Sequence, residues 1–214
     1  MHLDIYSDTV CPWCLVGKRR LEKALALRPE PELTVRWRPF QLNPGMPAEG
    51  MPRQEYVALK FSGRGGDAYA RIRGVGAEEG IAFAFERIAR QPNTLNSHRL
   101  IDLAWQEGRQ DAVVEALFSA FFLEGRDIGD RDVLAAAAAV AGMDGPSVAR
   151  YLDGEEGVER IGGEDAAARE AGISGVPFFV LDGAYALSGA QLPEIFHRLF
   201  DHGRQKAAEP ASAS

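Results

Sequence analysis

Along the chain, the spacing of hydrophobic and polar residues changes repeatedly, and each change predicts a new element. A short apolar run near the N-terminus predicts a strand over residues 3–8. In residues 11–27 apolar side chains recur at helical spacing opposite a basic face, which indicates an amphipathic helix. Residues 33–40 alternate with period two, as a half-buried strand does. A strand, a helix and a strand in this order form a βαβ unit with a right-handed crossover, so we expect parallel strands.

The middle of the chain shows helical patterns almost throughout. Residues 41–50 contain Asn43-Pro44-Gly45 and Met46-Pro47, two breaker sequences that predict a loop. The stretches of helical character after this loop are 54–61, 67–79, 96–107, 111–123, 130–141 and 146–152. A brief apolar piece at 81–85 has no periodicity that decides its state.

The C-terminal part combines helices with a hairpin. Residues 155–171 predict a long helix. Apolar strands over 178–181 and 185–187 are joined by Asp182-Gly183, a strong signal for a two-residue hairpin turn. Residues 191–205 form the closing predicted helix.

This order of elements predicts an α/β fold whose mixed, four-stranded sheet is parallel in its first half and hairpin-paired in its second. We expect the sheet domain to comprise residues 1–41 and 155–206, with an all-helical insertion domain over 42–154 between them. Residues 207–214 (A-A-E-P-A-S-A-S) predict a disordered tail.

Composition narrows the class of protein. Hydrophobic residues at 46% and charged residues at 26% describe a globular chain with enough apolar material for a core. A net charge of −7 argues against nucleic-acid or anionic-membrane partners, which need a basic surface. The sequence has neither an apolar run long enough for a membrane span nor the pattern of a signal peptide. We therefore expect a cytoplasmic protein, and the sequence does not indicate its oligomeric state.

The chemistry is carried by two cysteines spaced C-x-x-C, at the point where the first strand turns into the first helix. Pro12 suits the first helical position, which places Cys11 at the N-cap. Unpaired backbone N–H groups and the positive end of the helix dipole favour a thiolate there. We expect Cys11 to be the acidic, exposed nucleophile, and Cys14, one turn further on, to close a disulfide with it. The pattern predicts a redox site.

The two cysteines have three other possible interpretations. They could be buried hydrophobic residues, although the spacing with proline between them disfavours coincidence. A structural disulfide closing so small a loop removes little unfolded-state entropy. A zinc site commonly needs four ligands, and the chain has two cysteines and no H-x-x-x-H pair. Zinc would require His2 and His98 to converge in space, so we predict no metal.

Four motifs resemble one family when they are taken together. C-P-W-C and S-G-V-P resemble the thioredoxin fold, and the helical insertion is similar to that of DsbA-type proteins. The closer resemblance is to FrnE-like DsbA-family oxidoreductases. It rests on D-x-x-C-P-W-C at 8–14, P-N-T-x-x-x-H-R-L at 92–100, G-V-P-F-F at 175–179 and S-G-A-Q at 188–191. These motifs run from one end of the chain to the other in the family's order.

The resemblance implies a substrate site around the cysteines. It implies that Pro177 is cis and that the Val176 backbone faces the cysteines and pairs with an extended substrate. Pro177 could instead be an ordinary proline at the start of a strand. Pro12 and Trp13 are expected substrate contacts, although Trp13 could also be a packed turn residue.

The same resemblance places part of the insertion near the active site. It implies that Asn93 and His98 face the cysteines and contact substrate. The residues alone leave another interpretation of His98 equally open, in which it lies on the helix surface or serves a capping role.

The function that these features predict is thiol–disulfide exchange on protein or small-molecule disulfides, as oxidoreductase or isomerase. Cys11 would attack and Cys14 would resolve the mixed disulfide. We expect no bound cofactor, with glutathione as a candidate co-substrate. The Pro-Trp dipeptide lacks a histidine cation, which predicts milder oxidising power than Pro-His would give.

Two rival functions stay open. One is a glutathione-dependent isomerase or transferase acting on a small aromatic molecule. The 2-hydroxychromene-2-carboxylate isomerases and kappa-class glutathione transferases of this superfamily have that architecture, but typically carry serine where Cys11 stands. The other is a non-enzymatic binding module that responds to cysteine oxidation through the glycine-rich region 63–76.

Overall fold

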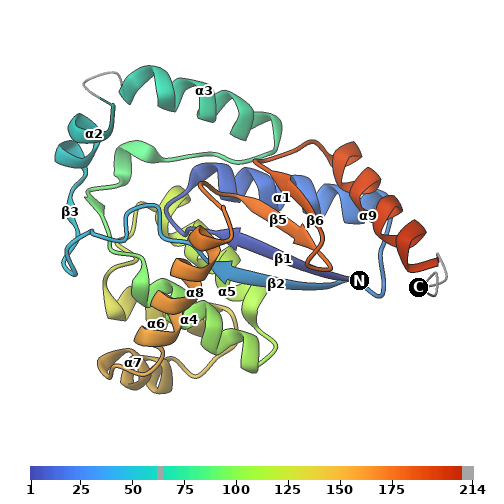
Figure 1. The fold of residues 1–214 in the computed structure, drawn as a ribbon. Coiled ribbons are helices and arrows are strands. Elements are labelled where there is room, and N and C mark those ends of the chain that lie inside the picture. Colours follow the sequence, from blue (N-terminus) through green and yellow to red (C-terminus); the bar gives the residue numbers. More distant parts are fainter. Residues whose placement is uncertain (62–64, 209–214) are drawn as a thin grey trace.

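The computed structural model describes residues 1–61 and 65–208, and its central sheet is the mixed, four-stranded sheet that the sequence predicts (Figure 1). The strand order is β2-β1-β5-β6. The strands are β1 (His2–Ser7), β2 (Thr34–Pro39), β5 (Phe178–Leu181) and β6 (Tyr185–Ser188). β1 and β2 are parallel, whereas β5 is antiparallel to both β1 and β6. The turn residues Asp182 and Gly183 both have positive φ, 51° and 67°, as the predicted tight hairpin requires.

Helices cover both faces of this sheet. α1 (Pro12–Leu27) and α9 (Pro193–Ala208) pack together on one face, while α8 (Val158–Glu170) lies on the other (Figure 1). Because side chains alternate along a strand, Phe179 packs edge-on against Phe196 of α9, while its neighbour Phe178 packs in a second cluster that includes Ala168 of α8.

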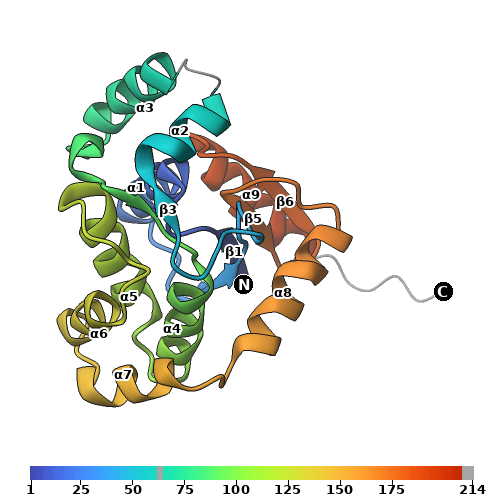
Figure 2. The same cartoon turned by 90° about the vertical axis from the view of Figure 1, so that its left-hand side faces the viewer.

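All six predicted helices of the middle segment are confirmed, with shifts of a few residues at their ends. They are α2 (Arg53–Phe61), α3 (Gly65–Glu78), α4 (Leu95–Gln106), α5 (Gln110–Phe118), α6 (Arg131–Val140) and α7 (Gly145–Asp153). Figure 2 shows them as two groups: α4 to α7 pack against one another, whereas α2 and α3 lie apart from them. The boundaries of the insertion as a domain stay a prediction.

Several local features differ from the prediction. A two-stranded sheet of β3 (Met51–Pro52) and β4 (Arg90–Gln91) was missed because two-residue strands leave no periodic signal. The piece at 81–85 leads into a 3₁₀ turn, Phe85–Arg87, and α5 ends in a π-helical turn, Ser119–Leu123.

The boundaries of the two C-terminal helices, α8 and α9, also differ from the predicted ones. α8 begins at Val158, after Gly157 with a left-handed φ of 82°, and not at residue 155. The prediction of a tail from residue 207 is wrong for its first two residues, because α9 continues to Ala208. The rest of the predicted tail, 209–214, lies outside the described residues. Within residues 1–61 and 65–208, no helix is long and apolar enough to cross a membrane.

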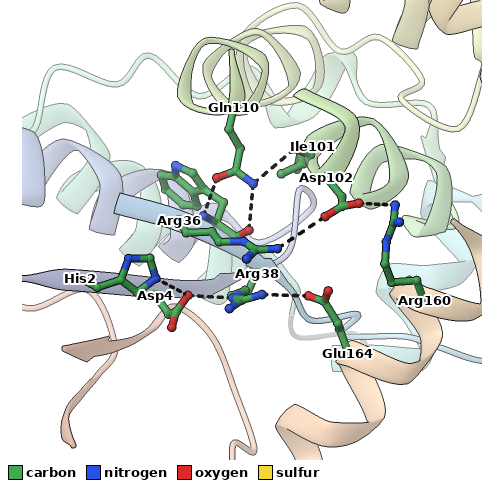
Figure 3. A network of polar contacts seen from close by, with 10 residues as sticks. His2, Asp4, Arg36, Arg38, Ile101, Asp102, Gln110, Arg160 and Glu164 are labelled. Carbon is green, nitrogen blue, oxygen red and sulfur yellow. Dashed lines mark hydrogen bonds and ion pairs between the residues drawn. The ribbon is translucent and has the colours of Figure 1, made fainter. Parts of the chain in front are cut away.

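A polar network fastens α4 and α8 to the sheet (Figure 3). Asp102 of α4 lies between Arg160 of α8 and Arg36 of β2, with 3.8 Å between Arg36 Nη2 and the Asp102 carboxylate. Arg38, two residues along β2, donates from Nε to Asp4 of β1 at 2.7 Å. Because Arg36 and Arg38 lie on the same face of β2, one row of charges joins the sheet to both helices.

Gln110, at the start of α5, forms hydrogen bonds with the backbone at the outer edge of β2 (Figure 3). Its Oε1 accepts from the Trp37 N–H at 2.8 Å, and its Nε2 donates to the Trp37 carbonyl at 3.1 Å. The amide therefore takes the place of a neighbouring strand at this residue, which blunts the edge for pairing with another chain.

Candidate active site

The two cysteines occupy the strand-to-helix turn that the sequence predicts. Cys11 is the N-cap residue of α1, with extended backbone angles (φ −94°, ψ 109°), and Pro12 is the first helical residue. The Cys11 N–H donates to the Asp8 carbonyl, and the Cys14 N–H donates to the Cys11 carbonyl, both at 3.0 Å. Both cysteines are thiols in this structure. The proline thus places Cys11 at the positive end of the helix.

The expectation that Cys11 is exposed is wrong. Only 4% of Cys11 is exposed, because the segment before β5 folds over its sulfur. The thiol donates to the Val176 carbonyl at 3.5 Å, and the Val176–Pro177 peptide bond is cis, which confirms the prediction for Pro177. Cys11 nevertheless lines a cavity of about 310 Å³, together with Pro12, Trp13 and Val176. A substrate sulfur would reach it through that cavity and not on an open surface.

Cys14 lies behind Cys11 and is 1% exposed. Burial raises the pKa of the Cys14 thiol well above its ordinary value, and the hydrogen bond between the two thiols adds to the rise. Hydrogen bonds from the Ser7 hydroxyl and the Asp8 backbone lower this pKa by smaller amounts. The two thiols are therefore unequal, since Cys11 lines the cavity and Cys14 is enclosed by protein.

The fit between the cysteine helix and the cis-proline segment depends on Gly17. A Cβ atom at this position would lie 3.0 Å from Pro177 Cγ and 3.3 Å from the Phe179 ring. Such contacts are tighter than a normal van der Waals separation. The absence of a side chain at Gly17 therefore lets α1 approach the segment that covers Cys11.

Two insertion helices complete the cavity wall. Lys60 of α2 lines the cavity, donates to the Tyr56 hydroxyl at 2.7 Å and lies 5.8 Å from the Phe61 ring centroid. The guanidinium of Arg71 in α3 lies 5.7 Å from the Trp13 ring centroid. Trp13 is therefore a half-buried wall residue, in contact with a cation.

A second, larger cavity of about 650 Å³ adjoins the first. The two cavities share Leu42 and Lys60 in their walls. The larger one is lined mainly by apolar side chains, among them Met46, Tyr56 and Leu59. The two cavities are therefore neighbours, and the side chains of Leu42 and Lys60 contribute to the walls of both.

Of the two expected substrate contacts from the insertion, neither lies in the cavity wall. Asn93 donates from Nδ2 to the Met46 carbonyl at 2.6 Å and accepts from the Leu95 N–H at 2.9 Å, so it holds the loop before β3 against the start of α4. His98 is 3% exposed, which excludes the surface position, and Thr94 is the N-cap residue. The Nε2 atom of His98 lies 3.4 Å from the Asp8 carboxylate, beneath the cysteine turn.

Asp8 is the residue at this site whose importance sequence reasoning missed. It is fully buried, and its Oδ2 accepts from the Leu42 N–H at 2.7 Å. The available signal was an acidic residue at the end of a strand, three positions before the first cysteine. Burying a carboxylate is costly unless hydrogen bonds or a cation compensate for the lost hydration, and the Leu42 N–H supplies one such hydrogen bond.

The zinc interpretation finds no support in the described residues. In residues 1–61 and 65–208 no group of three or more His, Cys, Asp or Glu side chains is placed to hold a metal ion. His2 begins β1, at the opposite end from the cysteine turn, where it contacts Asp4 at 3.3 Å. His2 and His98 therefore do not converge.

Comparison with known proteins agrees with this geometry. The family model described as "DSBA-like thioredoxin domain" matches residues 2–201. The probable DsbA oxidoreductase of Streptomyces coelicolor has 32% identity and a TM-score of 0.89, covering 100% of this chain and 94% of that one. YwbO of Bacillus subtilis, an uncharacterized protein, is 27% identical over 96% of this chain and 98% of its own.

A more distant structure shows the fold alone. The cytosolic disulfide reductase DsbM from Pseudomonas aeruginosa, solved with GSH, has 19% identity and a TM-score of 0.71, covering 96% of this chain and 100% of that one. The thioredoxin-like fold with a helical insertion, expected from the motifs, is thereby confirmed. The chain belongs to the family of DsbA-like thioredoxin-domain proteins.

Proposed function

We propose that the protein is a FrnE-like thiol–disulfide oxidoreductase in which Cys11 attacks a substrate disulfide and Cys14 resolves the product. The observation that supports this proposal is that the two cysteine thiols at the N-terminus of α1 differ in their access to the cavity. Cys11 lines the 310 Å³ cavity, whereas Cys14 is enclosed behind it. A substrate can therefore reach one sulfur only, and the other is placed to take over the bond that forms.

The cycle needs two exchanges. The Cys11 thiolate attacks one substrate sulfur, and the other substrate sulfur leaves as a thiolate. The Cys14 sulfur then attacks Cys11, forms the Cys11–Cys14 disulfide and releases the second substrate thiol. The reverse sequence oxidises a dithiol substrate. We propose that an extended substrate pairs with the Val176 backbone, whose carbonyl already accepts from the Cys11 thiol.

Glutathione is the co-substrate that we propose for returning the cysteines to the dithiol form. Its carboxylates would meet Lys60 and Arg71, two cations beside the cavity. The structure of DsbM with GSH supports this choice by analogy of fold. DsbM is a cytosolic protein, and a cytoplasmic location for this chain is part of the same proposal.

Turnover of insulin disulfides with glutathione as reductant tests the proposal. The variant Cys11→Ser is expected to lose all turnover. Cys14→Ser is expected to turn over more slowly, because the mixed disulfide is then resolved only by glutathione and not within the protein. Turnover surviving in Cys11→Ser would refute the assigned nucleophile. A Cys14→Ser variant that keeps full activity would favour the rival glutathione-dependent isomerase, and absence of exchange in the natural protein would favour a binding module.

A further inference from the structure

The loop between β2 and β3, residues 40–50, supplies part of the wall of both cavities beside the cysteines. Leu42 lines the 310 Å³ cavity that contains Cys11, and it also lines the neighbouring 650 Å³ cavity, together with Met46. Lys60 of α2 is the other side chain that the two walls share. The function proposed above uses Lys60 and leaves the position of Leu42 unexplained.

Leu42 packs beside the segment that covers Cys11. It is half-buried and packs against both hydrophobic clusters of the core, as Val176 does. Leu42 and Val176 also lie together in the wall of the cavity that contains Cys11. Because protein interiors are close-packed, a leucine held in such a wall limits the size of the group that fits beside the cysteine sulfur.

The peptide unit that leads into Leu42 is bound at both of its polar ends. The Leu42 N–H donates to the Asp8 carboxylate at 2.7 Å, and the Gln41 carbonyl of the same peptide unit accepts from the Arg169 guanidinium. The Gln41 N–H, one peptide unit earlier, donates to Asp165 at 2.7 Å. Since a peptide unit is planar, moving Leu42 would break several of these hydrogen bonds together.

The two α8 residues that hold Gln41 form one unit. Asp165 and Arg169 lie one turn apart, and Arg169 Nε donates to Asp165 Oδ2 at 3.0 Å. Asp165 is 5% exposed, so its carboxylate needs the cation and the Gln41 N–H as partners. The guanidinium also lies 4.3 Å from the Phe40 ring centroid. The pair therefore fixes residues 40 and 41 to α8, directly before Leu42.

The loop beyond Leu42 is attached to the insertion and not to α8. Asn43 donates from Nδ2 to the Tyr56 hydroxyl at 3.3 Å, and the Met46 carbonyl accepts from Asn93 at 2.6 Å. Leu42 thus lies where the contacts of the loop change from α8 to the insertion. Its position depends on the Asp165–Arg169 pair from one side only.

We propose, on the basis of the function proposed above, that Leu42 is a specificity-determining residue and that Asp165 and Arg169 are the positioning residues that hold it in the cavity wall. Leu42 limits the bulk on the carbon that carries the attacked substrate sulfur. The site thereby favours disulfides of unbranched thiols, such as cysteine and glutathione, over disulfides of thiols that are branched next to sulfur.

Reaction of the reduced protein with two isomeric disulfides tests the role of Leu42. The disulfide of thiolactic acid is branched at the carbon that bears sulfur, whereas the disulfide of β-mercaptopropionic acid is unbranched and has the same composition and charge. The readout is the ratio of the two second-order rate constants, branched over unbranched. We expect Leu42→Ala to raise this ratio about tenfold, the lower end of what one methylene decides in an apolar pocket, and Leu42→Phe to lower it.

The role of the α8 pair is tested with the same ratio. Arg169→Gln should raise the ratio by a smaller factor than Leu42→Ala does, because the loop can then move aside. In a protein that already carries Leu42→Ala, adding Arg169→Gln should change the ratio by less than about twofold, since the pair acts through Leu42. The matched control is Arg160→Gln, which removes another guanidinium of α8 from its ion pair with Asp102 and should leave the ratio unchanged.

The outcomes separate this inference from the proposed function. Equal ratios in the natural protein, Leu42→Ala and Leu42→Phe would overturn the specificity role. An unchanged ratio in Arg169→Gln, or an equal rise in Arg160→Gln, would overturn the positioning role. Absence of reaction between the natural protein and either disulfide would instead refute the proposed function.

A second variant covers the case in which Arg169→Gln does not fold. In Arg169→Lys, a single ammonium replaces the planar guanidinium that binds both Asp165 and the Gln41 carbonyl. The loop is then held by fewer hydrogen bonds, so the ratio should still rise above that of the natural protein. A natural ratio in Arg169→Lys would contradict the inference.

Discussion

Replacing Gly17 with alanine sets two effects of opposite sign against each other. Gly17 lies inside α1, where alanine is favoured over glycine by about 1 kcal/mol. The new Cβ would lie 3.0 Å from Pro177 and 3.3 Å from Phe179, and overpacking of this kind typically costs about 1–3 kcal/mol. The second effect is the larger, so we expect Gly17→Ala to change the free energy of unfolding by between zero and a loss of about 2 kcal/mol.

A matched control isolates the packing contribution. Gly162 lies inside α8, and a Cβ atom there would meet nothing within 4 Å. Gly162→Ala should therefore show the helix preference alone and stabilise the protein by about 1 kcal/mol. Urea unfolding of both variants measures the difference, which we expect to be about 1–3 kcal/mol in favour of Gly162→Ala.

The same substitution should also affect the active site. Any movement of Pro177 shifts the Val176 carbonyl, which lies 3.5 Å from the Cys11 sulfur. We expect Gly17→Ala to slow the attack by Cys11 on a disulfide, while Gly162→Ala leaves it unchanged. The reasoning is refuted if both alanine variants are stabilised equally and react at the same rate.

Three further predictions concern other contacts. Arg99→Lys should cost at least about 2 kcal/mol in urea unfolding, because a guanidinium that bonds four carbonyls between residues 151 and 156 becomes a single ammonium. Burial raises the pKa of Glu115, but hydrogen bonds and charges from Arg19 and Lys18 outweigh it and lower the pKa. The ionised Glu115 therefore stabilises the folded protein at neutral pH, and this contribution is lost as the pH falls through its lowered pKa. Acid should thus reduce the free energy of unfolding of the natural protein more than that of Glu115→Gln. Lys60→Gln should slow reaction with glutathione disulfide more than with an uncharged disulfide, which stopped-flow rates at low salt can measure.

The sequence was a good guide wherever a local pattern decides the structure. Pro12 placed Cys11 at the N-cap correctly, because the preference of proline for the first helical position depends on the backbone of one turn. The Asp182-Gly183 hairpin was equally local, since both residues must adopt positive φ.

What the sequence did not reveal depends on partners far along the chain. Cys11 is covered by Val176, which is 165 positions away, so no local pattern could show its burial. His98 and Asp8 meet only because α4 packs under the cysteine turn. Arg99 is buried among carbonyls more than 50 positions away, although an arginine in an amphipathic helix predicts an exposed side chain.

In the proposed mechanism each thiol has one task. Cys11 forms the mixed disulfide with the substrate, and Cys14 attacks that disulfide and releases the substrate thiol. Incubation of Cys14→Ser and Cys11→Ser separately with an oxidised peptide, followed by mass spectrometry of the intact proteins, tests this directly. The account predicts a stable peptide adduct on Cys11 in the first variant and none in the second. An adduct on Cys14 in the second variant, at a rate matching the first, would contradict it.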